Sequence, residues 1–438
     1  MTAYHCELAW LGGAQAERDV LVSVEGERIT AVEGGVTAPP GEAIRLPGLT
    51  IPGLANAHSH AFHRALRGRT HTGAGSFWTW RDQMYALAGS LDPDSYFQLA
   101  RATFAEMALA GISVVGEFHY LHHGPGGVPY ADPNAMGAAL VAAAADAGLR
   151  ITLLDTCYLH GGIGAGLDDT QRRFADRDAS AWADRASSLR AAAGVRIGAA
   201  IHSVRAVDPA AMAIVGAWAA ERGAALHAHV SEQPAENEQC AAAYGRTPTE
   251  LLSDAGVLSD GFTAVHATHL TGADVALLGA AKCWCCFCPT TERDLADGIG
   301  PSQALRRAGA RLTLGSDSHA VVDLLEEARA LELDERLARG VRGGHDAVAL
   351  LRMATEHGQA SLGWPDAGRI SPGGYADLTT IGLDSVRTAG ARAEDAAAVA
   401  VFAATAADIR HVVISGRVVA AGGRHTSIDV VDALRRVL

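Results

Sequence analysis

Eight short, β-rich apolar runs alternate with alanine- and leucine-rich stretches through the middle of this chain. The runs are residues 49–57, 112–118, 150–158, 195–201, 224–230, 262–267, 282–288 and 311–316. The intervening stretches have helix-forming composition, and two of them, 133–148 and 209–223, end at glycine as helices often do. Eight such units predict an α/β fold with a (β/α)8 TIM-like barrel over residues 51–365.

Both ends of the chain instead alternate short apolar stretches with Gly and Pro turns. Residues 20–35 and residues 410–425 each have the pattern of strand, glycine turn and strand. Neither end has enough strands to bury a face alone. We therefore expect residues 1–50 and 366–438 to pair into one small, discontinuous β-sandwich domain beside the barrel.

The charge balance limits the partners that the chain can have. Its formal net charge is -13 over 438 residues, whereas binding to phosphate backbones needs clustered Lys and Arg. We expect no nucleic-acid partner. The N-terminal residues lack a signal-peptide pattern, and no uninterrupted apolar stretch reaches about 18 residues. We expect a soluble, cytoplasmic protein without a membrane partner; its oligomeric state stays open, a homodimer being one alternative.

Four of the seven cysteines fall within one short run, AKCWCCFCPTT. They are Cys283, Cys285, Cys286 and Cys288. Structural zinc sites usually combine two cysteine pairs separated by a loop, and this run has no second half. Because cysteine behaves as a small buried hydrophobe, the run predicts a buried strand and no metal cluster. Disulfides are not expected in a cytoplasmic chain.

Histidine and aspartate residues fall where the predicted barrel strands end. His58 and His60 close the first run, His229 the fifth and His266 the sixth, and Asp317 follows the eighth. The carboxyl ends of barrel strands form one rim, so these side chains are expected to converge there. Imidazole nitrogens and a carboxylate suit Zn²⁺, and Fe²⁺ or Mn²⁺ would also be accepted.

We predict one ion per chain, held by His58, His60, His229 and Asp317. Glu232 lies three residues beyond His229, in position to carry protons without being a ligand. Its catalytic partners are predicted to be His266 and Asp317, and the sequence leaves open which of the two is the primary base. His227 is predicted to be a core residue, one layer deeper in the barrel. His269 is predicted to be a supporting or helix-capping residue.

The order of these motifs, HxH, HxxE, His and GSDSH, resembles the amidohydrolase superfamily, and the match covers nearly the whole chain. Many members bridge two metals with a carbamylated lysine that follows the first histidine pair. The sole lysine here, Lys282, comes too late in the chain, so the resemblance implies a mononuclear, deaminase-like site. Glu117 is an alternative bridging carboxylate, but its position near the second strand favours a structural role.

Finer motifs resemble the formimidoylglutamate deiminase family. They are HSHAFHRAL, SFWTWRDQMY, EFHYLHH, IHSVRAV, HVSEQ, TTERDLADGIGP and GSDSH. The resemblance implies hydrolysis of N-formimidoyl-L-glutamate to N-formyl-L-glutamate and ammonia, within histidine degradation. The family often has Gln where this chain has His63, which puts one substrate contact in question.

A small dicarboxylate amidine needs two carboxylate-binding groups, and arginine guanidinium groups supply them bidentately. The candidates on the rim loops are Arg81, Tyr120, His202 and Arg205, with His63 added by the family pattern. Two alternatives stay open. One is another mononuclear deaminase that acts on a guanine- or cytosine-like ring or on another small amidine. The other is a non-catalytic barrel with a structural metal, which the free Glu232 disfavours.

Overall fold

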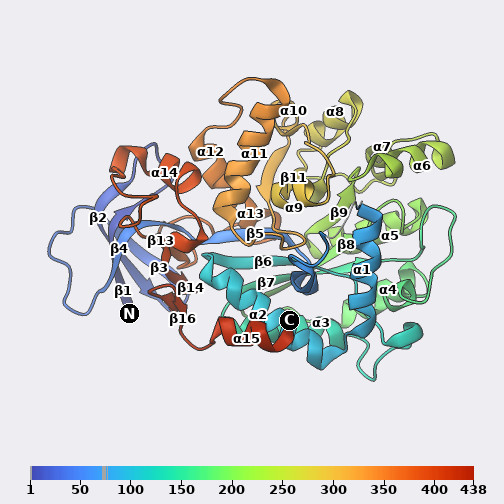
Figure 1. Ribbon diagram of the computed structural model, residues 1–438, viewed down its shortest axis with the longest axis horizontal. Helices are drawn as coiled ribbons and strands as arrows, with labels where there is room; N and C mark the ends of the chain where they lie inside the picture. The colour runs from blue at the N-terminus through green and yellow to red at the C-terminus, as the bar shows by residue number, and fades with distance from the viewer. Residues whose placement is uncertain (1, 72–74, 76) are drawn as a thin grey trace.

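The computed structural model describes residues 2–71, 75 and 77–438; Ser76, the first residue of the SFWTWRDQMY motif, lies outside them. Eight parallel strands, hydrogen-bonded in chain order, form the barrel in the centre of Figure 1. They are β5 (Leu54–Ser59), β6 (Ile112–His119), β7 (Arg150–Cys157), β8 (Val195–Ile201), β9 (Leu226–Val230), β10 (Phe262–His266), β11 (Trp284–Phe287) and β12 (Arg311–Leu314). The predicted barrel is confirmed.

The last strand meets the first where both strands end. The backbone N–H groups of Ser316 and Asp317 donate to the carbonyl of His58, at 3.1 and 3.0 Å. In return, the N–H of His60 donates to the carbonyl of Asp317 at 3.2 Å. A parallel bridge joins Ser59 to Asp317. The ring is therefore closed by the same short segments that carry three of the predicted metal ligands.

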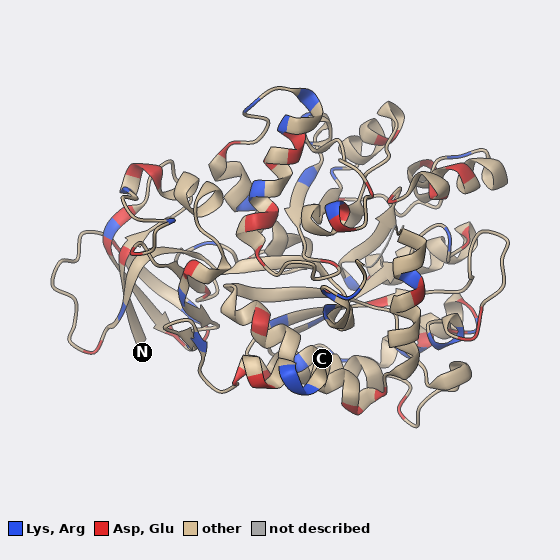
Figure 2. Cartoon of the chain, viewed as in Figure 1, with Lys and Arg blue, Asp and Glu red and all other residues tan. Residues whose placement is uncertain are grey.

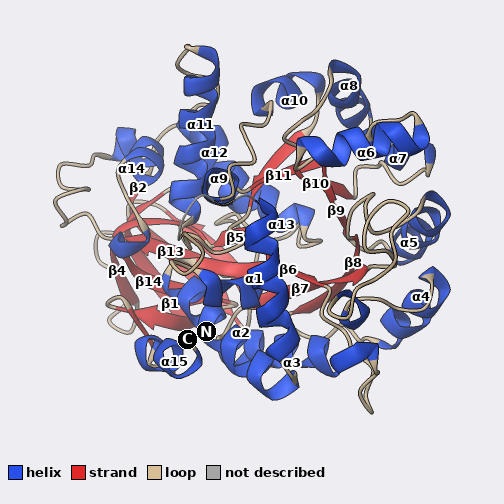
Figure 3. Ribbon diagram, turned by 45° about the vertical axis from the view of Figure 1, so that its right-hand side comes forward, coloured by secondary structure: helices blue, strands red, loops and turns tan. Residues whose placement is uncertain are grey.

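Helices surround the strands, as Figure 3 shows. They are α1 (Phe77–Ser90), α2 (Pro93–Leu109), α3 (Ala135–Asp146), α4 (Ala179–Ser188), α5 (Pro209–Arg222), α6 (Pro234–Tyr244), α7 (Pro248–Asp254), α8 (Gly272–Ala280), α9 (Pro289–Asp294), α10 (Ser302–Ala308), α11 (Leu324–Arg339), α12 (Ala347–Arg352) and α13 (Gly358–Ser361). Asp208 caps α5 by accepting from two backbone N–H groups, and Gly223 ends it in the left-handed region at φ 57°. The predicted helices at 133–148 and 209–223 correspond to α3 and α5.

Both ends of the chain contribute to a second eight-stranded sheet, in the order β16-β15-β14-β13-β4-β1-β2-β3. Its strands are β1 (Thr2–Ala9), β2 (Glu17–Glu25), β3 (Arg28–Glu33), β4 (Ile44–Pro52), β13 (Leu378–Ile381), β14 (Ile409–Ile414), β15 (Arg417–Ala421) and β16 (Arg424–His425). The sheet folds over its own core, since the Tyr4 hydroxyl donates to the carbonyl of Gly416 and the N–H of Ala376 to that of Glu27. The predicted pairing of the two ends is confirmed.

The run 49–57, predicted as one barrel strand, is divided at Gly53. Its first part belongs to β4, which pairs with β13 of the terminal sheet, and its second part is β5. A Cβ at Gly53 would lie 2.5 Å from the Ser113 hydroxyl and 2.8 Å from Cβ of Asp377. Only glycine permits this close approach. The predicted domain boundary after residue 50 lies within β4 and stays a prediction.

Two C-terminal helices were not expected from the strand-like pattern of the tail. They are α14 (Ala396–Phe402) and α15 (Val430–Val437), and α15 packs along α2 of the barrel. Among the described residues, we find no helix with both the length and the apolarity to cross a membrane. In the view of Figure 2, basic residues lie interspersed with acidic ones on the outer helices, as in the pair formed by Arg293 and Asp334.

Candidate metal centre and active-site cavity

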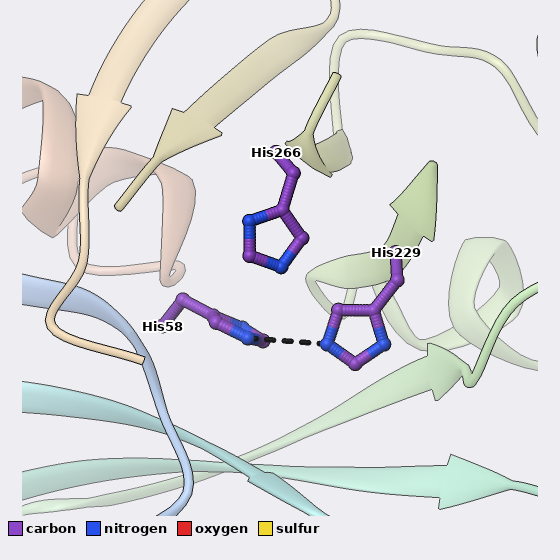
Figure 4. A group of neighbouring side chains, drawn as sticks. All are labelled: His58, His229 and His266. Carbon is purple, nitrogen blue, oxygen red and sulfur yellow. Dashed lines mark hydrogen bonds between the residues drawn. The ribbon is translucent and has the colours of Figure 1, made fainter. Parts of the chain in front are cut away.

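Three histidine rings from different strands converge at the carboxyl end of the barrel. Figure 4 shows His58 from β5, His229 from β9 and His266 from β10 turned toward a common space. The Nε2 atoms of His58 and His229 lie 3.2 Å apart. Asp317 Oδ1 lies 3.3 Å from Nε2 of His58 and 3.4 Å from Nε2 of His60. The structure thus brings together residues 259 positions apart in the sequence.

Backbone carbonyls fix the orientation of two of these rings. Nδ1 of His60 donates to the carbonyl of Phe118 at 3.0 Å, and Nδ1 of His229 donates to the carbonyl of His202 at 2.9 Å. A ring that donates from Nδ1 in its neutral form keeps a lone pair on Nε2. Such outer hydrogen bonds are usual for histidines that bind metal ions.

The protonation states also suit a cation. Burial lowers the pKa of His58, and it lowers the pKa of His60 to about 3, so both rings are neutral at physiological pH. Burial likewise holds the pKa of His229 well below its usual value. For Asp317, burial alone would raise the pKa, but the hydrogen bond with His58 and the positive charge of His266 hold it well below the usual range. Neutral imidazole rings therefore lie beside one ionised carboxylate, and the Nε2 lone pairs of His60 and His229 are free to bind a cation.

Three of the spacings between predicted ligand atoms match those expected around a tetrahedral divalent ion. Bonds of about 2.0–2.1 Å from zinc to nitrogen or oxygen would place neighbouring ligand atoms about 3.3–3.4 Å apart. Three separations match this spacing: 3.2 Å from His58 to His229, 3.3 Å from His58 to Asp317 and 3.4 Å from His60 to Asp317. His58, His60 and Asp317 thus form one group with ligand atoms close enough to hold a metal ion, and His58, His229 and His266 form an adjoining group that shares His58.

His266 and Glu232 lie beside this group. Nε2 of His266 is buried without a hydrogen-bond partner and lies 3.8 Å from both Glu232 Oε1 and Asp317 Oδ2. Burial by itself lowers the pKa of His266, but Glu232, Glu292 and Asp317 together raise it well above its usual value. Glu232 is 5% exposed and also pairs with Arg205. Both predicted proton carriers therefore reach the candidate metal centre.

A cavity of about 240 Å³ opens above these residues. The predicted site residues that line it are His60, His63, Arg81, Tyr120, His202, Arg205, His229, Glu232, His266 and Asp317. His58 lies beneath it, fully buried. The five predicted substrate-binding residues are thus brought to one cavity, although their roles stay predictions.

The two arginines on the cavity wall come from different segments: Arg81 lies on α1, and Arg205 lies in the loop after β8. Arg81 stacks on Trp78 and Tyr85, and its Nε is buried without a hydrogen-bond partner. Arg205 places Nη2 3.3 Å from Glu232 Oε2, and its Nε is also buried and unpartnered. Nε2 of His63 lies 3.0 Å from the Tyr120 hydroxyl. Two guanidinium groups thus retain capacity for an anionic ligand.

Sequence reasoning missed several residues of the cavity wall. They are Phe77, Trp78, Trp80, Met84, Tyr85, Tyr158, His160, Phe174, Gln239 and Leu295. The aromatic residues around Arg81 were visible in the motif SFWTWRDQMY, since aromatic rings clustered beside an arginine suggest a stacked guanidinium. Of the others, Met84 lies on α1 and Gln239 on α6, and the rest lie outside helices and strands.

The remaining predictions on single residues can now be compared with the structure. Lys282 is exposed and precedes β11, at the opposite end of the barrel from the cavity. Glu117 is buried, and it accepts from the Ser59 hydroxyl and from the N–H of Ala61, each at 2.6 Å. It therefore anchors the segment after β5, which agrees with a structural role.

The two histidines excluded from the site behave as core and supporting residues. His227 is fully buried, and its Nε2 lies 3.4 Å from the carbonyl of Ser361. His269 donates to the carbonyl of Asp297 at 2.7 Å. It thereby ties the loop after β10 to the loop after α9.

The cysteine run forms β11 with its flanks, and all four cysteines are buried, as predicted. Among the described residues no group of cysteines is arranged to hold a metal ion. Cys288, however, has its sulfur within 4.8 Å of ligand atoms of His266 and Asp317. Burial raises the pKa of its thiol well above the usual value, so it stays protonated beside the centre.

A second group of ligand-type side chains lies elsewhere, formed by His119, His122 and Asp155. Both oxygens of Asp155 already accept from Arg185, and one accepts from the Trp182 indole. The guanidinium supplies the positive charge that a metal ion would bring. We therefore read this group as a buried structural network.

A model of the amidohydrolase family matches residues 49–419. The chain belongs to the amidohydrolase family. It is 36% identical over 397 residues to the formimidoylglutamate deiminase of Pseudomonas aeruginosa, with 87% of each chain covered. It is 29% identical to the 5-methylthioadenosine/S-adenosylhomocysteine deaminase of Pelotomaculum thermopropionicum, covering 92% of this chain and 88% of the relative. This amidohydrolase is therefore a hydrolase of the deaminase type, acting on carbon–nitrogen bonds.

Solved structures agree with this amidohydrolase fold. An amidohydrolase from Brucella melitensis, 30% identical, superposes with a TM-score of 0.90 over 100% of this chain and 99% of that one. Atrazine chlorohydrolase from Arthrobacter aurescens, solved in complex with zinc, is 23% identical with a TM-score of 0.89, over 100% and 99% of the chains. At that identity the second comparison supports the fold alone.

Proposed function

We propose that this amidohydrolase hydrolyses N-formimidoyl-L-glutamate to N-formyl-L-glutamate and ammonia, with one zinc ion held by His58, His60, His229 and Asp317. The observation that carries the proposal is the pair of arginines on the cavity wall, each with a buried, unpartnered Nε, beside the proton-carrying groups. The 36% identity to a formimidoylglutamate deiminase supports it. We further propose that the reaction belongs to histidine degradation in the cytoplasm.

A zinc ion bound at such a site lowers the pKa of a water molecule toward neutrality. The chain supplies Asp317, an ionised carboxylate able to accept the proton of that water, and beside it His266, whose raised pKa makes its ring a hydrogen-bond donor. Asp317 Oδ2 and His266 Nε2 lie 3.8 Å apart, on the cavity side of the cluster. They would orient the water toward the formimidoyl carbon, where a carbon–oxygen bond forms.

Loss of ammonia then needs a proton on the departing nitrogen, because an unprotonated nitrogen is a poor leaving group. Glu232 lines the cavity and reaches His266 at 3.8 Å. Two protons must reach the imine nitrogen, one released from the water and one from the hydroxyl group formed on the tetrahedral carbon. Glu232 can take each in turn and deliver it to that nitrogen, and the hydroxyl oxygen becomes the formyl carbonyl as the carbon–nitrogen bond breaks. The products are the N-formyl amide and neutral ammonia, so atoms and charge balance.

The substrate carboxylates are assigned to the polar groups on the outer wall. Arg81 and Arg205 would provide charge-assisted hydrogen bonds. Tyr120 and His202 line the same cavity, and their rings lie 5.2 Å from those of His60 and His229, respectively. A buried N–H without a hydrogen-bond partner is costly, so a dicarboxylate that accepts from the Nε groups of Arg81 and Arg205 offsets a cost that a neutral ligand leaves in place.

A second candidate is deamination of a neutral ring, as in the adenosine-type relatives. It is favoured by the aromatic wall formed by Trp78, Trp80, Tyr85 and Phe174, on which a planar base could stack. The arginines count against it, because a neutral ring offers no anionic group to the unpartnered Nε atoms of Arg81 and Arg205.

Ammonia release by the zinc-loaded protein separates these candidates. N-formimidoyl-L-glutamate should be the best substrate, compared at equal concentration with N-formimidoyl-L-aspartate, guanine, cytosine and adenosine. Preference for a nucleobase or nucleoside would replace the proposal with the ring-deaminase alternative. Absence of release from every substrate, with zinc bound, would favour the non-catalytic alternative.

A further inference from the structure

The motif TTERDLADGIGP has no part in the function proposed above, yet it sends one side chain to the site. Glu292 lies on α9 and is 5% exposed. Its Oε1 accepts from the N–H of Cys288 at 2.9 Å and lies 3.4 Å from Nδ1 of His266. The other ring nitrogen of His266, Nε2, faces Glu232 and Asp317.

We propose that Glu292 is a positioning residue that holds Nδ1 of His266 as a hydrogen-bond donor, so that proton exchange with the cavity takes place only at Nε2. This inference rests on the proposed function for its kinetic part. Glu292 itself does not line the cavity, so it acts through His266.

The backbone conformation at the end of β10 fixes the position of His266. His266 and the following Ala267 adopt left-handed φ values of 67° and 49°, which non-glycine residues rarely hold without compensation. The N–H of Ala267 donates to the carbonyl of Val230 at 3.1 Å, which secures the turn at the end of β10. The turn directs the ring of His266 into the site. Glu292 contacts Nδ1, so Nε2 is the nitrogen that faces Glu232 and Asp317.

The hydrogen bond from Cys288 makes it possible to separate the effect of the Glu292 charge from that of its hydrogen bond. Because this N–H donates to Oε1, the amide of Glu292→Gln should turn its oxygen toward Cys288 and so also toward His266 Nδ1. Glu292→Gln thus keeps the hydrogen bond and removes the charge, whereas Glu292→Ala removes both. If positioning is the role, the Gln variant should rescue what the Ala variant loses.

Glu327 of α11 provides a matched control, because it contacts the same end of α9. It is fully buried and accepts from the N–H and hydroxyl of Thr290, at 3.0 and 2.5 Å. Like Glu292 it is a buried carboxylate that binds the first turn of α9, but it does not contact His266. Glu327→Gln therefore reports the effect of disturbing α9 alone.

The first measurement is the tautomer of His266, by ¹⁵N NMR of histidine-labelled, zinc-loaded protein at a pH where the ring is neutral, with His266→Asn to assign the signal. We expect Nδ1 to be protonated in the parent, in Glu292→Gln and in Glu327→Gln, and the Nε2-protonated form to dominate in Glu292→Ala. Retention of the Nδ1-protonated form in Glu292→Ala overturns the proposal.

The second measurement is steady-state ammonia release. Glu292→Ala should lower kcat by about 10- to 100-fold, the usual effect of losing an outer hydrogen bond, with KM changed less than about 3-fold. Glu292→Gln should stay within about 5-fold of the parent. Parent-like kcat in Glu292→Ala, or an equal loss in Glu327→Gln, overturns the positioning role. If the parent itself releases no ammonia, the proposed function fails while the tautomer result still decides the role of Glu292.

Discussion

Nη2 of Arg205 and Oε2 of Glu232 lie 3.3 Å apart on the wall of the cavity. Arg205 also has Nε 3.9 Å from Glu236 Oε2. Its guanidinium therefore neutralises two buried carboxylates while it faces the space that a substrate would fill. A mutation at either member of the Arg205–Glu232 pair must be interpreted with this contact in mind.

Glu232→Gln should keep its zinc and most of its substrate affinity, while kcat falls by about 10² to 10⁴ because a positioned proton carrier is lost. Metal analysis and ammonia-release kinetics on the same preparation measure both. Glu238→Gln, an exposed neighbour on α6, is the control. Near-normal turnover with full metal occupancy would refute the proton-transfer role.

Arg205→Met should lose about 2 to 5 kcal/mol of transition-state binding, because a substrate carboxylate is left unpaired. Circular dichroism should be unchanged. A substrate analogue lacking one carboxylate separates substrate binding from the pairing with Glu232. For one such analogue the penalty of the mutation should shrink; an equal penalty for every analogue would mean that Arg205 acts only through Glu232.

Elemental analysis should find one tightly bound divalent ion per chain. His229→Asn and Asp317→Asn should each lose most of it, since each removes one of four ligands. His227→Asn is a matched control on the same strand, because His227 is buried two residues away and does not face the cluster. Two firmly bound ions per chain would contradict the mononuclear site.

Glu117 should make the metal-free protein less stable as the pH rises. Burial raises the pKa of Glu117 from 4.5 to about 8, so between these values the folded chain holds a proton that the unfolded chain has released. The free energy of unfolding should therefore fall from about pH 4.5 to about pH 8, by up to about 5 kcal/mol.

Urea denaturation across this pH range measures the effect of Glu117. Glu117→Gln can keep the hydrogen bonds to Ser59 and Ala61 without the titration, so its stability should vary less with pH. Parallel pH profiles for the two proteins would show that Glu117 is already ionised in the folded state.

Much of this molecule could be predicted from its sequence because it depends on local periodicity. Strands that end in His58, His229 and His266 must present them at one rim once the barrel is recognised. The division of the first run at Gly53 could not be predicted, because it depends on Ser113 and Asp377, which are distant in the sequence.

Contacts between loops were equally inaccessible. The pairing of Arg205 with Glu232, and the approach of Glu292 to His266, join segments whose relative positions only the closed barrel defines. The sequence also did not reveal α15, because it lies in a tail whose pattern is typical of strands. That helix packs against α2 of the barrel, a contact with a segment more than 300 residues away that no local pattern indicates.

The hydrogen bonds between His58, His60 and Asp317 where β5 meets β12 have a consequence for assembly. A chain that has formed seven strands of the barrel lacks Asp317 at the cluster, and so lacks a complete set of ligands. Tight metal binding should therefore begin only after the last strand has docked. An ion bound there would cross-link the two ends of a segment of about 260 residues and so oppose its opening. Removing the ion should loosen this seam before any other part of the ring, giving the earliest loss of amide protection at residues 58–60 and 315–317.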